Sequence, residues 1–220
     1  MLCAACDGEV NGYLEEQCEA VAEHEKGNGI ALMSLCSIVT EKVDCHEANA
    51  ATYVSTESLL PGKMGRREAS SLPQTGKVTV YQPGDTLISN IRPYFKKIWH
   101  ADCAGTCSGD VLVFRAKQQE QAGYLYSCMR NERFFDHVMK GAKGTKMPRG
   151  DKKQMLTYQI SGNPSVQAIS FIRTALKQIS NANRENDRLI ALRDSLLPKL
   201  MSGEIDVSKV DLTQLNSHLA

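Results

Sequence analysis

The stretch that decides the fold is Ile169-Ser-Phe-Ile-Arg-Thr-Ala-Leu-Lys-Gln-Ile-Ser-Asn-Ala-Asn-Arg-Glu-Asn-Asp-Arg-Leu-Ile-Ala-Leu-Arg-Asp-Ser-Leu-Leu-Pro-Lys-Leu200. Mostly apolar positions recur along it at alternating steps of three and four residues: Ile169, Ile172, Leu176, Ile179, Asn183, Asn186, Ile190, Arg193, Leu197 and Leu200. Such a seam, sustained over about five heptads, is typical of a helix that pairs with a second helix. Pro164 at the start, with Pro198 and Ser202-Gly203 at the end, predicts a helix over about 164–201.

The predicted helix is too long for a domain of this size. At about 1.5 Å per residue it spans on the order of 50 Å, so part of it must project and pack on something else. The rest of the sequence offers no second helix of that length, so we expect a partner from another copy or another subunit. The residues expected at this dimer contact are Ile169, Ile172, Leu176, Ile179, Asn183, Asn186, Ile190 and Leu197.

Two asparagines interrupt the seam near its middle. Asn183 and Asn186 can each meet a counterpart near the midpoint of an antiparallel pair, which lowers stability but fixes register. The alternative is that the middle of the helix is solvated. The regular seam on both sides favours the pairing interpretation.

The region before the long helix predicts an α+β domain. Alternating or β-branched runs at 77–81, 86–89 and 110–115 predict strands, and 119–140 predicts one or two helices. We expect a curved, mostly antiparallel β-sheet with flanking helices. Residues 10–26 predict a further helix with Leu14, Cys18, Val21 and Ala22 on one face and glutamates on the other, ended by Gly27-Asn28-Gly29. That helix either contacts a partner or covers the core, and we favour the core.

The charge balance argues against a wholly non-specific nucleic-acid binder. The 220 residues include 26 basic and 25 acidic side chains, but the basic ones concentrate at 92–97 and 140–153, which allows one positive face. No membrane span or secretory signal is recognised, so a cytoplasmic location is expected. There is no Walker loop, dinucleotide-binding motif, methyltransferase motif or convincing nuclease motif, so we expect neither an enzyme nor a cofactor.

The eight cysteines leave a rival interpretation open. Cys3 and Cys6 form one close pair and Cys103 and Cys107 another, which together suggest a zinc site of four thiolates or a thiol-dependent enzyme. The alternative is a set of buried or idle thiols in a reducing compartment. About a hundred residues separate the pairs, so we expect no metal site.

Four motifs, in order, carry a resemblance to one family. They are Gly84-Asp-Thr-Leu-Ile-Ser-Asn-Ile-Arg-Pro-Tyr-Phe-Lys-Lys97, Cys107-Ser-Gly-Asp-Val-Leu-Val-Phe-Arg115, Gly144-Thr-Lys-Met-Pro-Arg149 and Leu192-Arg-Asp-Ser-Leu-Leu-Pro-Lys-Leu-Met-Ser-Gly-Glu-Ile205. The sequence resembles the specificity subunits of type I restriction–modification systems over about 30–207. The entry to the long helix, at 160–167, departs from the family's usual stretch, and residues 1–29 match nothing in it.

The resemblance implies half of a specificity subunit. Family members contain two target-recognition domains and two long helices, whereas this chain has one of each. The implied division is an N-terminal helical extension at 1–29, a DNA target-recognition domain at 30–162, a coiled-coil helix at 163–207 and a tail at 208–220. A homodimer would bind a symmetric, bipartite site on double-stranded DNA and recruit modification (methyltransferase) and restriction subunits. A coiled-coil scaffold without DNA contact, as in an anti-restriction decoy, is the other alternative.

The expected DNA contacts lie in three segments. The loop at 140–149 combines small residues with charge, and it either binds DNA or is a solvated surface loop. Asn90 and Arg92 are candidates for base contact, with a scaffold role equally open for Arg92. Lys96 and Lys97 are phosphate contacts or plain surface, and the loop around Met64 is a further candidate for base contact. The full set is Lys143, Thr145, Lys146, Arg149, Asn90, Arg92, Lys96, Lys97, Lys63, Arg66 and Arg67.

Overall fold

The computed structural model describes residues 4–25 and 29–205, with side chains described from residue 11 onward. The predicted tail at 208–220 and the turn residues Gly27 and Asn28 lie outside the described residues. The helices are α1 (Ala4–His24), α2 (Leu32–Leu35), η1 (Cys45–Glu47), η2 (Pro93–Phe95), η3 (Gln119–Gln121), α3 (Ala122–Arg130), α4 (Glu132–Lys140), α5 (Lys152–Met155) and α6 (Val166–Met201). The strands are β1 (Gly29–Ala31), β2 (Cys36–Ile38), β3 (Lys42–Asp44), β4 (Tyr53–Val54), β5 (Lys77–Tyr81), β6 (Thr86–Ser89), β7 (Ile98–His100), β8 (Gly105–Cys107), β9 (Val111–Ala116) and β10 (Gln159–Ser161).

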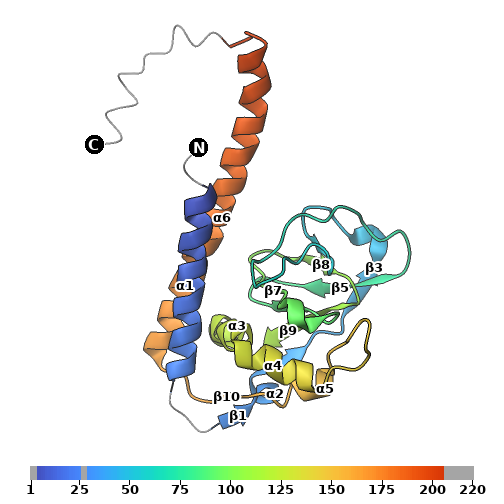
Figure 1. Cartoon of the computed structure of the whole chain (residues 1–220), viewed down its shortest axis with the longest axis vertical. Helices are drawn as coiled ribbons and strands as arrows, with labels where there is room; N and C mark the ends of the chain where they lie inside the picture. Colours follow the sequence, from blue (N-terminus) through green and yellow to red (C-terminus); the bar gives the residue numbers. More distant parts are fainter. Residues whose placement is uncertain (1–3, 26–28, 206–220) are drawn as a thin grey trace.

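The fold is α+β with mostly antiparallel sheets and a long C-terminal helix, as predicted (Figure 1). The strands form three sheets, with the orders β2-β9-β6-β7, β3-β5-β8-β4 and β1-β10. Every pairing is antiparallel except that of β4 with β8. The predicted strands at 77–81 and 86–89 have the predicted bounds, and the third begins and ends one residue later than predicted.

The central strands β6 and β9 separate two parts of the core. Ile88, Leu112 and Phe114 belong to the cluster that α1, α3 and α6 also line. Leu87 and Val113 point the other way, into the cluster beneath β5 and β8. Because successive side chains of a strand face opposite sides, two strands covered on both faces carry nearly continuous apolar runs. This arrangement fixes the sheets against the helices.

The helix α6 begins at a well-formed cap and ends at the predicted residue. The Ser165 hydroxyl accepts a hydrogen bond from the Ala168 amide at 3.1 Å, which caps the first turn. Pro198 lies inside the last turn, where its missing N–H removes only one helical hydrogen bond. The helix ends at Met201, and Gly203 then takes a left-handed conformation with φ of 71°.

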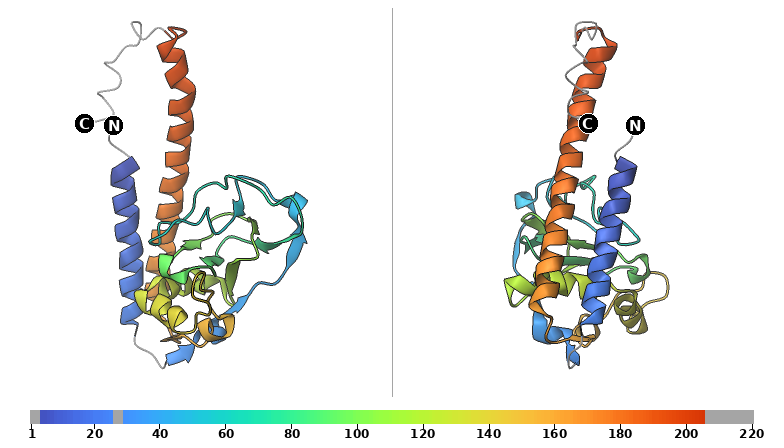
Figure 2. Two further views of the ribbon diagram at one scale, coloured as in Figure 1. Left: turned by 45° about the vertical axis from the view of Figure 1, so that its right-hand side comes forward. Right: turned by 90° about the vertical axis from the view of Figure 1, so that its left-hand side faces the viewer.

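The helix α1 lies beside the first half of α6 and runs antiparallel to it (Figures 1 and 2). Glu25 accepts hydrogen bonds from Ser165 at one end, and Asn11 donates one to Asn183 at 3.0 Å at the other. Cys18 and Ala22 are buried in the same cluster as Ile172, Leu176 and Ile179 of α6, as a helix that covers the core requires. The prediction that the partner of the seam must come from another copy or subunit is therefore wrong for the first half of α6, which α1 of the same chain covers.

The two halves of α6 have different surroundings. We call residues 166–183 the proximal half and residues 184–201 the distal half. Most of the distal half projects beyond every other described element (Figure 2). Its large apolar side chains are exposed: Leu189, Ile190, Leu192, Leu196, Leu197, Leu200 and Met201. Among the described residues, no helix combines the length and apolar character that crossing a membrane requires.

Candidate nucleic-acid interface

Backbone hydrogen bonds bring the three segments that were predicted to contact DNA onto one surface. The amide of Lys63 donates to the carbonyl oxygen of Lys96 at 2.9 Å, and the amide of Gly62 donates to that of Phe95 at 2.8 Å. On the other side of η2, the amide of Arg92 donates to the carbonyl oxygen of Pro148 at 2.8 Å. Segments 62–67, 90–97 and 143–149 are therefore neighbours, with η2 between the other two.

The backbone around η2 is held in an uncommon conformation. Arg92, Lys96 and Lys63 have φ values of 50°, 51° and 64°, in the left-handed region that side chains with a Cβ rarely adopt. Each such residue costs on the order of 1–3 kcal/mol and persists where its surroundings hold it, which is often at a binding site. Pro93 begins the turn between two of them. The interface is thus built on a constrained turn.

The loop at 143–149 presents the predicted phosphate contacts to solvent. The backbones of Lys143 and Arg149 exchange two hydrogen bonds of 2.9 Å, which close the loop at its base. The side chains of Lys143, Thr145, Lys146 and Arg149 are all exposed. Lys143 and Arg149 also form ion pairs at the protein surface, with Asp151 at 3.4 Å and Asp110 at 3.2 Å. Such surface pairs are weak, so both cations remain available to a polyanion.

Several other predicted contacts have structural partners. Asn90 is buried, which is unfavourable for the base contact predicted for it. Lys97 donates to the carbonyl oxygen of Thr56 at 2.6 Å, and burial lowers its pKa. The Arg66 guanidinium donates to the carbonyl oxygen of Ala51 and lies 4.8 Å from the ring centroid of Trp99. The side chains of Lys97 and Arg66 therefore hold the loops in place.

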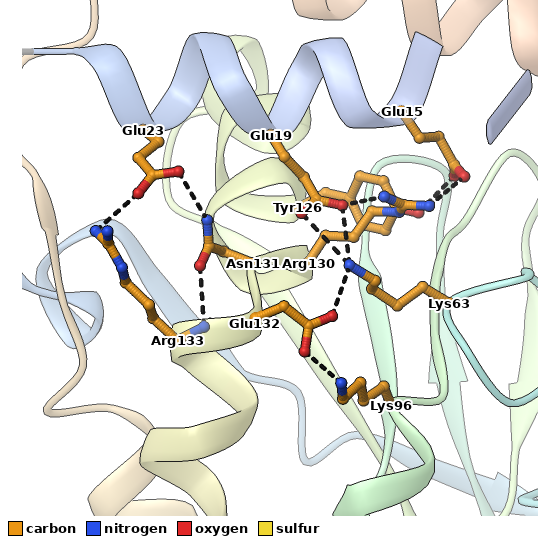
Figure 3. Close-up of polar contacts among 10 residues, drawn as sticks. All are labelled: Glu15, Glu19, Glu23, Lys63, Lys96, Tyr126, Arg130, Asn131, Glu132 and Arg133. Carbon is orange, nitrogen blue, oxygen red and sulfur yellow. Dashed lines mark hydrogen bonds and ion pairs between the residues drawn. The ribbon is translucent and has the colours of Figure 1, made fainter. Parts of the chain in front are cut away.

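The α1 glutamates reach into this region (Figure 3). Glu19 forms ion pairs with both Arg130 and Lys63, while Glu15 pairs with Arg130 at 2.7 Å and accepts a hydrogen bond from Tyr126 at 2.8 Å. Burial raises the pKa of Glu15, which the charge of Arg130 opposes. The Lys63 side chain is only 15% exposed, so in the structure it links α1 to the domain and is not a free phosphate contact.

A second part of the same network touches η2. Glu132, at the start of α4, pairs with Lys63 at 3.2 Å and with Lys96. The hydrogen bond from Lys96 lowers the pKa of the Glu132 carboxyl. Glu23 pairs with Arg133 at 2.7 Å and accepts a hydrogen bond from Asn131, the cap of α4. The network therefore fastens α1 to α3, α4 and two of the three interface segments.

The predicted dimer residues divide between the two halves of α6. Ile172, Leu176 and Ile179 are buried in the chain's own core, because α1 and α3 cover them. Gly123 of α3 permits this close approach, since a Cβ there would lie 3.0 Å from Ile172 and from Leu176. Asn183 already has a partner in Asn11 of the same chain. The predicted dimer residues in the distal half are Asn186, Ile190 and Leu197.

The cysteine pairs do not assemble a described metal site. Cys107 is buried, and burial raises its pKa to about 12, which disfavours the thiolate that zinc or a nucleophile requires. Cys3 lies outside the described residues, as does the side chain of Cys6. Within the described part of the chain, potential ligands gather only as Asp44, Cys45 and His46, none of which belongs to the predicted set.

Comparison with known proteins gives no family-model match and no matching curated protein, but solved structures match. The S subunit of the type I restriction–modification system from M. genitalium superposes with a TM-score of 0.54 at 13% identity, over 89% of this chain and 55% of that chain. The chain has the fold of a type I S subunit. The likeness therefore agrees with the family that the sequence motifs resemble.

Two further structures match with lower TM-scores. The HsdS subunit from Thermoanaerobacter tengcongensis has a TM-score of 0.44 at 16% identity, over 91% of this chain and 53% of that chain. A chain from a structure of type I complex assembly and conformational transition has a TM-score of 0.46 at 16% identity, over 89% of this chain and 53% of its own. The chain spans about half the length of the S subunits it matches.

Sequence reasoning missed the roles of the α1 glutamates. It placed them on the solvent face opposite Leu14 and Cys18, whereas Glu15 and Glu19 are largely buried against the domain. The spacing of four residues between Glu15 and Glu19 places both on one helix face, and this was the only sequence pattern that could have indicated a shared partner. Their partner Arg130 lies over a hundred residues away in the sequence. No local pattern connects the two.

Proposed function

We propose that this chain is the DNA-recognition subunit of a type I restriction–modification system and is not itself an enzyme. The observation that carries the proposal is the convergence of three predicted DNA-binding segments on one surface of an S-subunit fold. The subunit acts in the cytoplasm, where it recruits modification (methyltransferase) and restriction subunits to its site. It needs no cofactor for recognition, because cations and base-contacting side chains suffice.

We assign the DNA contacts according to how exposed each predicted side chain is. Lys143, Lys146 and Arg149 bind phosphates, with Thr145 and backbone amides as hydrogen-bond donors. Arg67, Lys96 and Arg92 flank this loop from the other two segments and complete the interface, with Arg66 at its edge. Lys63, Lys97 and Asn90 support the surface from beneath. The recognition domain remains 30–162, with α1 as an accessory helix.

Assembly as a dimer is the second part of the proposal. The exposed apolar side chains along the distal half of α6 form one face. Contact of this face with water is unfavourable, and an antiparallel second helix would bury it. Asn186, Ile190 and Leu197 lie on it, and α1 confines the dimer contact to this half by covering the other. A two-fold dimer would place one recognition domain on each half of a symmetric, interrupted site.

Binding of duplex DNA by the chain with its modification subunits tests the proposal. A randomised duplex pool should yield one enriched sequence, bound with a strong dependence on salt. Lys146→Ala should weaken binding to all duplexes and reduce the salt slope by about 0.9. Lys177→Ala, at an exposed lysine of the proximal half, is the matched control and should change neither. Equal binding to all duplex sequences would contradict the proposal and favour a coiled-coil scaffold or decoy.

A further inference from the structure

Each of the three interface segments also exposes a large apolar side chain. Met64 belongs to the first segment, Tyr94 and Phe95 to η2, and Met147 to the loop at 143–149. Tyr94 is 45% exposed and Phe95 is 40% exposed. Single exposed apolar residues are ordinary on protein surfaces. Here all three segments carry one, and hydrogen bonds at Gly62 and Pro148 join those segments to η2. We call these four side chains the apolar tip.

The two aromatic rings of this tip lie next to each other on a constrained turn. Their centroids lie 4.6 Å apart at an angle of 53°. The turn that carries them is closed by hydrogen bonds from Phe95 to Arg92 at 3.0 Å and from Lys96 to Pro93 at 2.8 Å. The left-handed backbone at Arg92 and Lys96 fixes both ends of the turn. The backbone that presents the rings to solvent is therefore constrained, which lowers the backbone entropy lost on binding.

The surroundings of the tip indicate its occupant. Lys96 and Arg92 flank the rings in sequence, and Arg149 pairs through a backbone bridge with Ile91. Cations around an apolar centre are complementary to nucleic acid, in which charged phosphates surround stacked bases. Apolar and aromatic side chains of DNA-binding proteins insert between base steps and unstack them. Stacking on aromatic rings tolerates many sequences, but the cost of opening a step depends on the step.

We propose that Tyr94 and Phe95 form a wedge that inserts at a base step of the bound duplex and unstacks it. The chain then selects its site by the deformability of that step as well as by base edges. Arg92 and Lys96 hold the adjoining phosphates, while Met64 and Met147 cover the rims of the opened step. This inference rests on the proposed function, and it adds residues that the sequence motifs did not single out as contacts.

The test uses the chain with its modification subunits and a duplex that carries the site enriched from the random pool. 2-Aminopurine is placed in turn at each position except the methylated base and its neighbours, because methyltransferases flip their target base out of the stack. The wedge predicts a severalfold rise in fluorescence at one step per half-site. With Tyr94→Ser/Phe95→Ser the rise should vanish, and affinity for the site should fall by about tenfold or more. Non-specific binding should be unchanged.

The control variant is Phe171→Ser, which removes an exposed aromatic ring from the proximal half of α6 and should leave fluorescence and affinity unchanged. Thermal melting confirms folding, and Tyr94→Ser alone replaces the double variant if that variant melts early. If the double variant gives the same fluorescence rise and the same affinity as the wild type, the wedge is overturned but the proposed function is not. The same conclusion follows if the wild type shows no fluorescence rise, even if the double variant loses affinity. A wild-type complex without sequence preference contradicts the proposed function instead.

Discussion

The proximal and distal halves of α6 carry the same spacing of apolar residues but differ in what covers them. Ile172 in the proximal half is fully buried, whereas Leu197 in the distal half is 51% exposed. The helix α1 explains the difference, since its buried side chains pack on the proximal half and most of the distal half extends beyond it. A heptad pattern thus indicates that a helix face will be covered, but it does not say whether the cover comes from the same chain or from another.

The largest effect is expected from a charge in the distal half. Leu197→Glu places a carboxylate within the proposed dimer contact, where burying it is costly. We expect the dimer dissociation constant to rise by about a hundredfold or more, while the free energy of unfolding of the monomer changes by less than about 0.5 kcal/mol. Sedimentation velocity and urea unfolding measure the two quantities.

Ser195→Glu is the control for that variant, because Ser195 lies on the opposite face of the same turn. It should leave the dimer intact. A wild-type chain that stays monomeric at all concentrations would contradict the dimer. Equal effects of the two substitutions on the dimer dissociation constant would indicate that the contact lies on another face of α6.

The next largest effect is expected where α1 is fastened to the domain. Arg130→Ala leaves Glu15 without its buried cation and Glu19 with Lys63 alone, which should destabilise the chain by about 3–5 kcal/mol. The matched control is Arg133→Ala, which breaks the exposed pair with Glu23 and should cost about 0–1 kcal/mol. Chemical denaturation measures both. Similar costs for the two would mean that the α1 network is as weak as a surface pair.

Removing a core side chain from the proximal half should act on the monomer. Ile172→Ala creates a cavity among α1, α3 and α6 and should cost about 2–5 kcal/mol of unfolding free energy. The exposed Val166, also in the proximal half, provides the comparison, and Val166→Ala should change stability by less than about 0.5 kcal/mol. If Ile172→Ala instead left the monomer unaffected but weakened the dimer, the proximal half would be a contact between copies.

The smallest effect is expected at Asn183, where the proximal half of α6 meets the distal half. Asn183 bonds Asn11 at an exposed position, so Asn183→Ala should cost no more than about 0.5 kcal/mol and should leave dimerisation unchanged. Denaturation and sedimentation measure the two. A tenfold change in the dimer constant would show that Asn183 pairs between chains in solution.

Local patterns predicted the elements well, and long-range packing explains what they missed. The alternation in 77–81 and the seam after Ser165 gave those elements nearly their observed bounds, because period and caps are local signals. The burial of Asn90 and Lys63 depends on segments distant in sequence. The same holds for Glu19, whose helix was predicted but whose partners on α3 and the 62–67 segment were not.

The candidate interface shows the same limit. The motif around Arg92 and the loop around Lys146 were identified separately, from composition and resemblance. That their backbones hydrogen-bond, and that Tyr94 and Phe95 lie between this loop and the 62–67 segment, follows only from the way the loop between α4 and α5 packs against the segment after β6. A left-handed conformation at a non-glycine residue such as Lys96 likewise carries no signal in the sequence.

DNA recognition by a symmetric dimer can be tested by mapping methylated bases in cells that carry this chain with its modification subunits. We predict one interrupted motif with two-fold symmetry, which disappears with Leu197→Glu and persists with Ser195→Glu. A methylation pattern that is unchanged when the chain is removed would contradict DNA recognition. A motif with two unrelated halves would contradict the symmetric dimer.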